Sequence, residues 1–216
     1  MKKIVIASNN LGKLTEIGAI LAPLDIEIVP QSMLGVSEAD EPHCTFVENA
    51  LAKARHASWH TGLPALADDS GICVDALRGA PGVHSARFAG DPPAGAAGGR
   101  NDQDERNNRK LLELLANETN RKVHYYCVIV LTRHADDPRP MVCEAEWHGE
   151  IMRSPRGGGG FGYDPLFLIP ELHRTAAELA PEYKNRISHR GQALAALAAG
   201  LRAERRKERG EKSKIR

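Results

Sequence analysis

Apolar residues recur with two different periods near the N-terminus, and each period predicts one kind of element. Residues 3–7 form a short apolar run that ends in polar residues typical of a turn. Leucine and isoleucine then recur three or four positions apart over residues 11–21, which is the spacing of one helix face. Residues 24–29 form a second apolar run before a proline. This region therefore predicts a strand, a helix and a second strand.

The rest of the chain continues to mix helix and strand signals. Thr45 and Glu48 have the spacing of a capping box and predict a helix to about His60. Residues 123–132 and 141–147 are strand-like runs around a proline-containing turn, so we expect a hairpin. Further predicted elements are a strand at 72–77 after the ADDSG sequence, a Gly-, Pro- and Ala-rich and partly mobile connection at 78–100, a helix at 107–115, a second capping box at 175–178, and a helix from His189 to about Lys207 that Ser188 could cap.

Helices and strands do not alternate strictly, so the order favours an α/β fold with a mixed, partly antiparallel sheet. We expect one domain over residues 1–201. Residues 202–216 carry eight Lys or Arg against three Glu. This tail is interpreted as a solvated helix end that becomes disordered rather than as an RNA-binding arm.

Composition narrows the functional classes. The 216-residue chain has a net charge of +1 spread along its length, which gives no overall footprint for nucleic acid or membrane binding. Its apolar runs are too short to span a bilayer, and its N-terminus does not resemble a signal peptide. The four cysteines lie far apart, as expected for reduced thiols. We therefore expect a cytoplasmic protein.

The most unusual segment is residues 157–164, where five glycines fall within six positions and an aromatic residue and an acid follow. Glycine inside a helix or strand costs roughly 0.5–1 kcal/mol relative to alanine, so this run favours close approach of the backbone to another group. A flexible linker is the alternative. Because an apolar, aromatic sequence follows at once, we interpret the segment as one wall of a ligand pocket.

Residues 8–13 lie between the first predicted strand and its helix. Exposed N–H groups and the helix dipole at such a turn favour an anion, and Lys13 would add a positive charge. The sequence is not a Walker P-loop, because Leu14 follows Gly12-Lys13 and the upstream glycine is absent. An ordinary capped helix remains the alternative.

Asp68 and Asp69 are adjacent carboxylates, which repel each other unless a cation or hydrogen bonds offset their charge. Magnesium prefers such oxygen ligands, and one aspartate could instead activate water as a general base. An exposed turn is equally consistent with the sequence. Glu38, Asp40 and Glu41 lie upstream and could complete a metal site or form a solvated loop.

A third group of polar residues, at 184–191, brings several hydrogen-bond donors to the start of the last helix. Arg190 offers a planar fork of donors, and Lys184 a long flexible stem. His189 alone would be read as structural, but the cluster favours a binding site.

Together these motifs resemble the inosine triphosphate pyrophosphatase family, also called XTP/dITP diphosphatases. The resemblance covers residues 3–201. It rests on seven motifs in order, namely SNNLGKLTE, TFVENALAKARHA, ADDSG, APGVHSARFAG, GGFGYDPLF, TAAEL and KNRISHRGQAL. The resemblance implies an elongated two-lobed α/β fold around a mixed, twisted sheet flanked by helices, with the active site in the cleft.

The same resemblance implies an activity and a set of site residues. Members hydrolyse the α–β phosphoanhydride of deaminated purine nucleoside triphosphates with Mg²⁺, and they are homodimers. Asp69 would be the proton acceptor and a metal ligand together with Glu41, and Lys13, Lys53 and Asp68 would assist catalysis. The implied substrate-binding residues are Ser8, Asn9, Asn10, Leu11, Gly12 and Lys13 for the phosphates, Ser70 beside them, and Phe161, Gly162, Tyr163, Asp164, Lys184, His189 and Arg190 for the purine.

The chain departs from the family pattern at two positions, since Tyr183 replaces a usual glutamate and Ala145 a frequent glycine. Two other functions stay open at this point. One is a related pyrophosphatase for modified pyrimidine nucleotides, and the other is a nucleotide-binding protein without catalysis.

Overall fold

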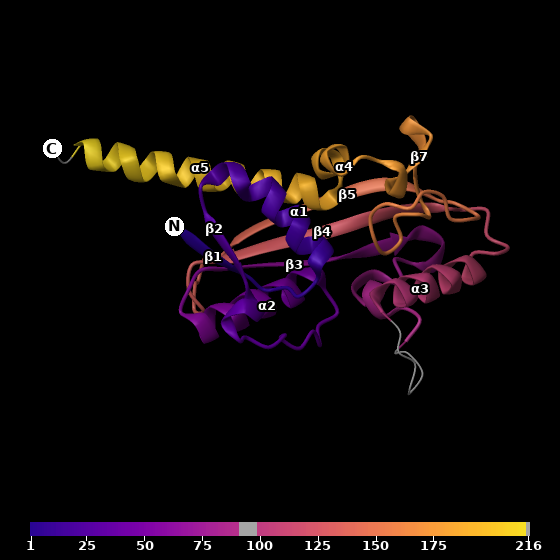
Figure 1. Cartoon of the computed structure of the whole chain (residues 1–216), viewed down its shortest axis with the longest axis horizontal. Helices are drawn as coiled ribbons and strands as arrows, with labels where there is room; N and C mark the ends of the chain where they lie inside the picture. Colours follow the sequence, from indigo (N-terminus) through magenta and orange to yellow (C-terminus); the bar gives the residue numbers. More distant parts are fainter. Residues whose placement is uncertain (91–98, 215–216) are drawn as a thin grey trace.

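The structure is a computed structural model that describes residues 1–90 and 99–214, and it has an elongated α/β architecture (Figure 1). The strands are β1 (Lys3–Ile6), β2 (Glu27–Pro30), β3 (Ala65–Val74), β4 (Lys122–Thr132), β5 (Met141–Ile151), β6 (Phe167–Ile169) and β7 (Arg174–Thr175). Among the described residues they form one seven-stranded sheet in the order β2-β1-β3-β4-β5-β6-β7. β1 pairs in parallel with β2 and β3, and the other pairs are antiparallel, which confirms the mixed sheet.

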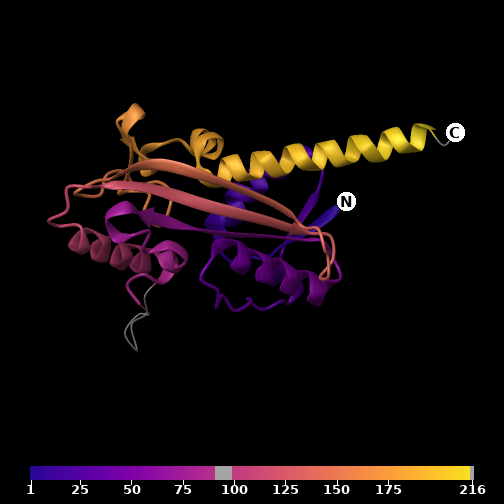
Figure 2. The same ribbon diagram turned by 180° about the vertical axis from the view of Figure 1, so that it is seen from behind.

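The helices are α1 (Leu11–Leu21), α2 (Phe46–Thr61), α3 (Arg100–Leu114), α4 (Pro181–Ile187) and α5 (His189–Lys214). α1 and α5 lie on one face of the sheet and α2 on the other (Figures 1 and 2). Since side chains alternate along a strand, one strand serves both layers. Ile4 and Ile6 pack with α1 and α5, whereas Val5 packs with the alanines of α2.

A separate hydrophobic core fills the far end of the sheet. Leu111 of α3 and Leu115, which follows the helix, pack there with Tyr125, Trp147 and Phe167, all of them buried. The long strands β3, β4 and β5 run through both ends of the molecule, so the two cores share one sheet. This arrangement gives the two lobes of the elongated fold.

The largest correction to the predicted elements concerns residues 68–71. They lie inside β3, which pairs with β4 without interruption, and they are not the turn that leads into a strand at 72–77. Asp68 is opposite Ile129 and Asp69 is opposite Val128 in this pairing. Charged residues are depleted in strands, but here each carboxylate is compensated by basic side chains on its own face of the sheet.

Several other boundaries differ from the predictions. β2 begins at Glu27 because a short 3₁₀ helix occupies Ala22–Leu24, and β5 extends to Ile151 through its pairing with β4 and β6. The 78–100 segment contains the 3₁₀ helix Gly82–Arg87 (η4) and the start of α3. Residues 91–98 of this segment lie outside the described ones, and its partial mobility stays a prediction. α5 continues to Lys214, beyond the helix end expected near Lys207. The division of the chain at residue 201 stays a prediction.

Candidate functional site

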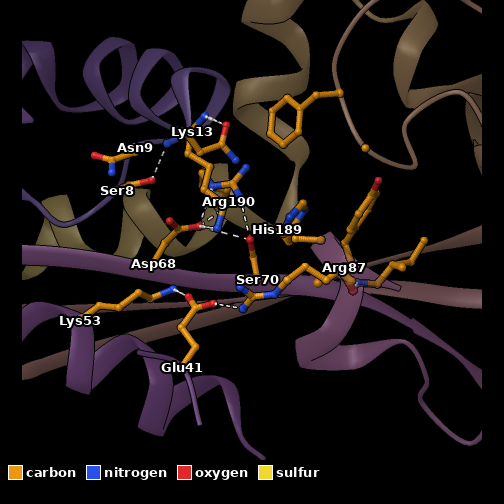
Figure 3. A pocket seen from close by; sticks show the side chains of 18 of the residues that line it. Ser8, Asn9, Lys13, Glu41, Lys53, Asp68, Ser70, Arg87, His189 and Arg190 are labelled. Carbon is orange, nitrogen blue, oxygen red and sulfur yellow. Dashed lines mark hydrogen bonds and ion pairs between the residues drawn. The ribbon is translucent and has the colours of Figure 1, made fainter. Parts of the chain in front are cut away.

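A cavity of about 480 Å³ lies where the two lobes meet. It is bounded by the β1–α1 turn, by β3, by η4, by the loop before β6, and by α4 and the start of α5. The predicted site residues that line it are Ser8, Asn9, Asn10, Lys13, Glu41, Lys53, Asp68, Ser70, Phe161, Gly162, Tyr163, Asp164, Lys184, His189 and Arg190. Leu11, Gly12 and Asp69 are not part of its lining. The structure thus gathers residues from distant parts of the sequence around one space (Figure 3).

The β1–α1 turn presents the N-terminus of α1 to this cavity. Asn10 caps the helix, because its side-chain oxygen accepts hydrogen bonds from the backbone N–H groups of Gly12 (3.0 Å) and Lys13 (3.3 Å). Ser8 accepts a hydrogen bond from the backbone of Asn10 at 3.2 Å. The positive end of the helix dipole and the Lys13 ammonium lie together there, a combination suited to an anionic group. Leu11 is 78% exposed and points away from the fold.

Asp68 projects to the α1 and α5 face of β3. Its Oδ2 lies 3.0 Å from Lys13 Nζ and 3.1 Å from Arg190 Nη2, and its other oxygen is buried without a hydrogen-bond partner among the described residues. Burial would raise the pKa of Asp68, but Lys13, Arg190 and Lys53 together hold the pKa well below its ordinary value. Asp68 is therefore a permanently ionised counter-charge.

Asp69 projects to the opposite face and meets α2. Its Oδ1 lies 3.1 Å from Lys53 Nζ, and its Oδ2 accepts a 3.4 Å hydrogen bond from Asn49. Lys53 also contacts Glu41 Oε1 at 2.6 Å, and Arg87 contacts the other oxygen of Glu41 at 3.0 Å. Burial raises the pKa of Asp69, and Glu41 adds to this, while Lys53 and Lys13 oppose it.

The Glu41 and Asp69 pair is the part of the site that could hold a metal ion. Among the described residues no group of three or more His, Cys, Asp or Glu side chains has metal-binding geometry. However, a magnesium ion usually takes only one or two carboxylates and completes its shell with phosphate oxygens and water. Glu38 and Asp40 line the cavity too, but Glu41 is the acid that shares Lys53 with Asp69. Two carboxylates around one cationic group fit such an ion.

At the other end of the cavity, ion pairs organise the predicted purine-binding side chains. Lys184 Nζ lies 2.6 Å from Asp164 Oδ2 and 3.1 Å from Glu16 Oε1, and Glu16 also pairs with Arg190. The Phe161 ring lies over both cations, with its centroid 4.9 Å from Lys184 Nζ and 5.8 Å from the guanidinium carbon of Arg190. Glu16 thus connects Lys184 and Arg190, and both cations contact the Phe161 ring.

His189 is buried at the start of α5 and stacks on Tyr125. The two ring centroids are 4.5 Å apart and the planes are nearly parallel, at 7°. Burial, with Arg190 and Lys184 nearby, lowers the pKa of His189 well below its ordinary value, so the imidazole is neutral. Its Nδ1 is buried and has no hydrogen-bond partner among the described residues. The Tyr125 hydroxyl lies 3.2 Å from Asp164 Oδ1, so Tyr125 links the imidazole to the Phe161 loop.

Two glycines are required by close approach. A Cβ on Gly12 would lie 2.7 Å from Cδ1 of Phe161, so the phosphate-side turn and the aromatic ring touch only because residue 12 has no side chain. Gly160 has φ of +73°, and a Cβ there would collide with the Asp164 carboxylate. Of the glycine run, Gly162 lines the cavity, whereas the glycines at 157–160 do not, and three of these instead pack against Ala177 and Asp164. The predicted pocket wall is therefore formed by residues 161–164 rather than by the whole run.

Comparison with known proteins places the chain in a family. The model of the Ham1 family matches residues 4–200. The chain belongs to the Ham1 family. It is 67% identical over 201 residues to the dITP/XTP pyrophosphatase of Nitrosomonas europaea, covering 93% of this chain and 95% of that protein. It is 59% identical over 205 residues to the dITP/XTP pyrophosphatase of Ralstonia nicotianae, covering 94% and 98%.

Solved structures of Ham1 proteins share the fold. A HAM1 protein from Coxiella burnetii superposes with a TM-score of 0.83 at 48% identity, covering 94% of this chain and all of that one. A nucleoside-triphosphatase, or dITP/XTP pyrophosphatase, from Mycobacterium abscessus gives a TM-score of 0.69 at 40% identity, with coverage of 90% and 97%. In addition, none of the described helices is both long and apolar enough to cross a membrane.

Several polar contributors to the Ham1 site were missing from the sequence interpretation, among them Arg87, which pairs with Glu41, and Asn49, which donates to Asp69. Glu16 lies one helical turn after Lys13, a spacing that places both on the same side of α1 and could have indicated it. Tyr125 reads as an ordinary core residue of a strand. Asp104 lines the cavity from α3. It is one of several charged residues in that helix, so the sequence pattern does not single it out as a site residue.

Proposed function

We propose that this Ham1 protein hydrolyses deaminated purine nucleoside triphosphates (dITP, ITP, XTP and dXTP) to the monophosphate and pyrophosphate. Such an activity would remove these nucleotides before they enter DNA or RNA. The observation that carries the proposal is the polarity of one cavity, with a helix N-terminus and lysines at one end and a stacked histidine, an aromatic ring and buried cations at the other. The activity named for its close relatives supports it.

The triphosphate would bind at the β1–α1 turn. Ser8, Asn9 and Asn10 border the N-terminus of α1, and Lys13 and Lys53 line the cavity beside it. These two ammonium groups and the helix dipole would offset much of the negative charge of the nucleotide. Such positioning and electrostatic stabilisation account for most of the catalysis of phosphoryl transfer.

Water would be activated on the α2 face of β3. Asp69 would accept the proton as the water oxygen attacks the α-phosphorus, and the bond from the α-phosphorus to the bridging oxygen would break to release pyrophosphate. Lys53, 3.1 Å from Asp69, would hold this carboxylate in place and reach the phosphates that enter beside it. Glu41 and Asp69 would bind Mg²⁺, which would supply further neutralisation of phosphate charge when bound.

The base would bind between Phe161 and the His189 end of the cavity. Phe161 provides an aromatic face, and neutral His189 has one ring nitrogen that carries a proton and can donate to the 6-keto oxygen of hypoxanthine or xanthine. Arg190 and Lys184 add positive charge on the same side. Adenine would present amino hydrogens to these donors, and sites built for one polar atom reject its mismatch by up to about 10⁴–10⁵-fold.

The test is a panel of standard and deaminated NTPs and dNTPs, assayed with Mg²⁺ for both pyrophosphate and phosphate. We expect pyrophosphate as the first product from dITP, ITP and XTP, and slow turnover of ATP. Phosphate as the first product would contradict cleavage between the α and β phosphates. Rapid turnover of modified pyrimidine nucleotides instead would favour that alternative substrate class.

The resemblance also supports a homodimer in the cytoplasm, which stays part of the proposal. Sedimentation equilibrium over a range of protein concentrations measures the mass directly. A mass that stays near the 23.5 kDa of one chain would contradict the dimer.

A further inference from the structure

α3 holds the backbone of the purine-side loop at the edge of the cavity, which Asp104 lines. Asp104 Oδ2 accepts a 2.7 Å hydrogen bond from the backbone N–H of Gly162, and Asn108 Nδ2 donates a 3.0 Å hydrogen bond to the Gly162 carbonyl. Asp104 and Asn108 are four residues apart on α3, so both side chains leave the helix on the same side. We call this pair of contacts the α3 clasp.

The α3 clasp fixes the residue in the loop that is most free to rotate. The N–H of Gly162 belongs to the peptide group before its Cα, and its carbonyl belongs to the peptide group after it. Holding both groups therefore restrains φ and ψ of Gly162, which has φ of +64° and no atom within 4 Å of a built Cβ. Glycine has the largest conformational freedom of any residue, so a restraint here has the most effect on the neighbouring Phe161.

The α3 helix is itself fixed to the opposite wall of the cavity. Asn107 is buried, and its side chain donates to the carbonyls of Ser85 (3.3 Å) and Ala86 (3.1 Å) in η4. The Tyr163 hydroxyl donates to the same Ser85 carbonyl at 2.8 Å. The helix thus connects η4 to the Phe161 loop, and both segments line the cavity.

The α3 clasp also decides which groups are left to recognise a base. The Gly162 N–H is occupied by Asp104, and the Phe161 N–H donates to Asp164 Oδ2 at 3.0 Å. These two backbone donors are therefore already bonded within the protein. The keto group would then be recognised by side chains such as His189. A base stacked on Phe161 can reach them only if the Phe161 ring is held in a fixed position.

We propose that Asp104 and Asn108 are positioning residues for base selectivity. By locking Gly162 they set the place of the Phe161 ring and keep the loop N–H groups from the base. The inference rests on the proposed function for the identity of the base, a 6-keto purine, but it concerns binding rather than bond cleavage. It can therefore be tested with nucleoside monophosphates, in the absence of turnover.

The experiment compares the wild type with Asp104→Ala, Asp104→Asn and Asn108→Ala. Calorimetry measures the affinity for inosine and adenosine monophosphates, and steady-state kinetics separates KM from kcat for dITP. We expect Asp104→Ala to weaken inosine monophosphate about tenfold, which is the size of one charged hydrogen bond. KM for dITP should rise in parallel, kcat should change by less than about twofold, and the preference over the adenine nucleotide should narrow.

Two matched variants make the result specific. Asp104→Asn keeps an oxygen that can accept from the Gly162 N–H, so it should restore most of the affinity. Glu105→Gln removes one negative charge from the next, exposed residue of α3 and should leave affinity unchanged. Unchanged affinity in both Asp104→Ala and Asn108→Ala would overturn the inference. An equal loss for both monophosphates with a lower Tm would overturn it too, because it would show only a structural role.

Failure of the proposed function would look different. If the wild type released no pyrophosphate from dITP, the proposed activity would be wrong, while the monophosphate affinities would still decide the role of the α3 clasp. If Asp104→Ala does not fold, Asn108→Ala decides alone. A reduced preference for inosine monophosphate in that variant supports the clasp, and an unchanged preference contradicts it.

Discussion

Asp68 and Asp69 are neighbours of the same chemical type, yet their surroundings are opposite. On the α1 and α5 face, the Asp68 carboxylate is met directly by Lys13 and Arg190, and its pKa lies well below the ordinary value. On the α2 face, Asp69 shares a single cation, Lys53, with Glu41, and its pKa is raised, first of all by burial. The strand separates the two side chains by its alternation alone.

The difference indicates a division of labour. The Asp68 side is a saturated network in which Asp164, Glu16 and Asp68 alternate with Lys184, Arg190 and Lys13 from the base end to the phosphate end. On the Asp69 side, Glu41 and Asp69 share the buried Lys53, and the exposed Arg87 pairs with the second oxygen of Glu41. We therefore expect substitutions on the Asp68 side to change stability and those on the Asp69 side to change chemistry.

The largest expected effect is that of Asp69→Asn on turnover. Asparagine keeps an oxygen for Lys53 but cannot take a proton from water, and it is a poor metal ligand. Pyrophosphate release from dITP should fall by about 10³-fold or more. The free energy of unfolding should change little, because Lys53 keeps its ion pair with Glu41 and the ionised form of Asp69 is already disfavoured by burial. A pyrophosphate assay and a urea titration measure both quantities. Wild-type turnover in this variant would remove Asp69 from the proposed chemistry.

The matched substitution on the other face is Asp68→Asn. It leaves Arg190 and Lys13 buried beside a neutral group, and breaking a buried ion pair from one side costs about 3–5 kcal/mol of stability. Urea unfolding should therefore separate the two variants, with Asp68→Asn much the less stable. If the two variants lose the same stability and the same activity, the proposed division between the faces is wrong.

A smaller effect is expected where the two ends of the cavity touch. A methyl group in Gly12→Ala would lie 2.7 Å from the Phe161 ring and would force that ring to move. Overpacking of this kind costs about 1–3 kcal/mol, so KM for dITP should rise about fivefold or more. Gly18→Ala on the same helix is the control, since its Cβ would meet nothing within 4 Å. Equal KM values in both variants would contradict a contact between turn and ring that matters for binding.

These contrasts also show how far the sequence could lead. The N-terminal turn, the pocket wall at residues 161–164 and the donors at Lys184, His189 and Arg190 were predicted because each is a local motif with its own chemistry. The path of Asp68 and Asp69 was not predicted. Their sequence suits a turn, and only the basic residues brought in from α1, α2 and α5 make a strand stable there.

Residues that act through tertiary contacts were the ones missed. Tyr125 has the sequence context of a core strand. It stacks on His189 only because α5 packs against β4, although the two residues are 64 positions apart in the sequence. Asp104 and Asn108 lie on a polar helix whose charged residues look alike before its orientation is known. No local pattern distinguishes such residues from solvated ones, because their role is set by the loop they meet.

The smallest expected effect is the loss of stability at low pH that follows if His189, beside Arg190 and Lys184, stays unprotonated in the folded protein. His189 is neutral in the folded protein, whereas in the unfolded chain it takes up a proton below about pH 6.5. The unfolded state then binds more protons, so stability falls as the pH drops through that value, by about 1.4 kcal/mol per pH unit at most. Urea titrations at pH 7.5 and 5.5 should show a loss of about 1 kcal/mol in wild type that His189→Gln lacks and exposed His134→Gln retains. Parallel pH curves for all three proteins would mean that His189 takes up its proton equally in both states, and that the network around Asp68 tolerates another cation.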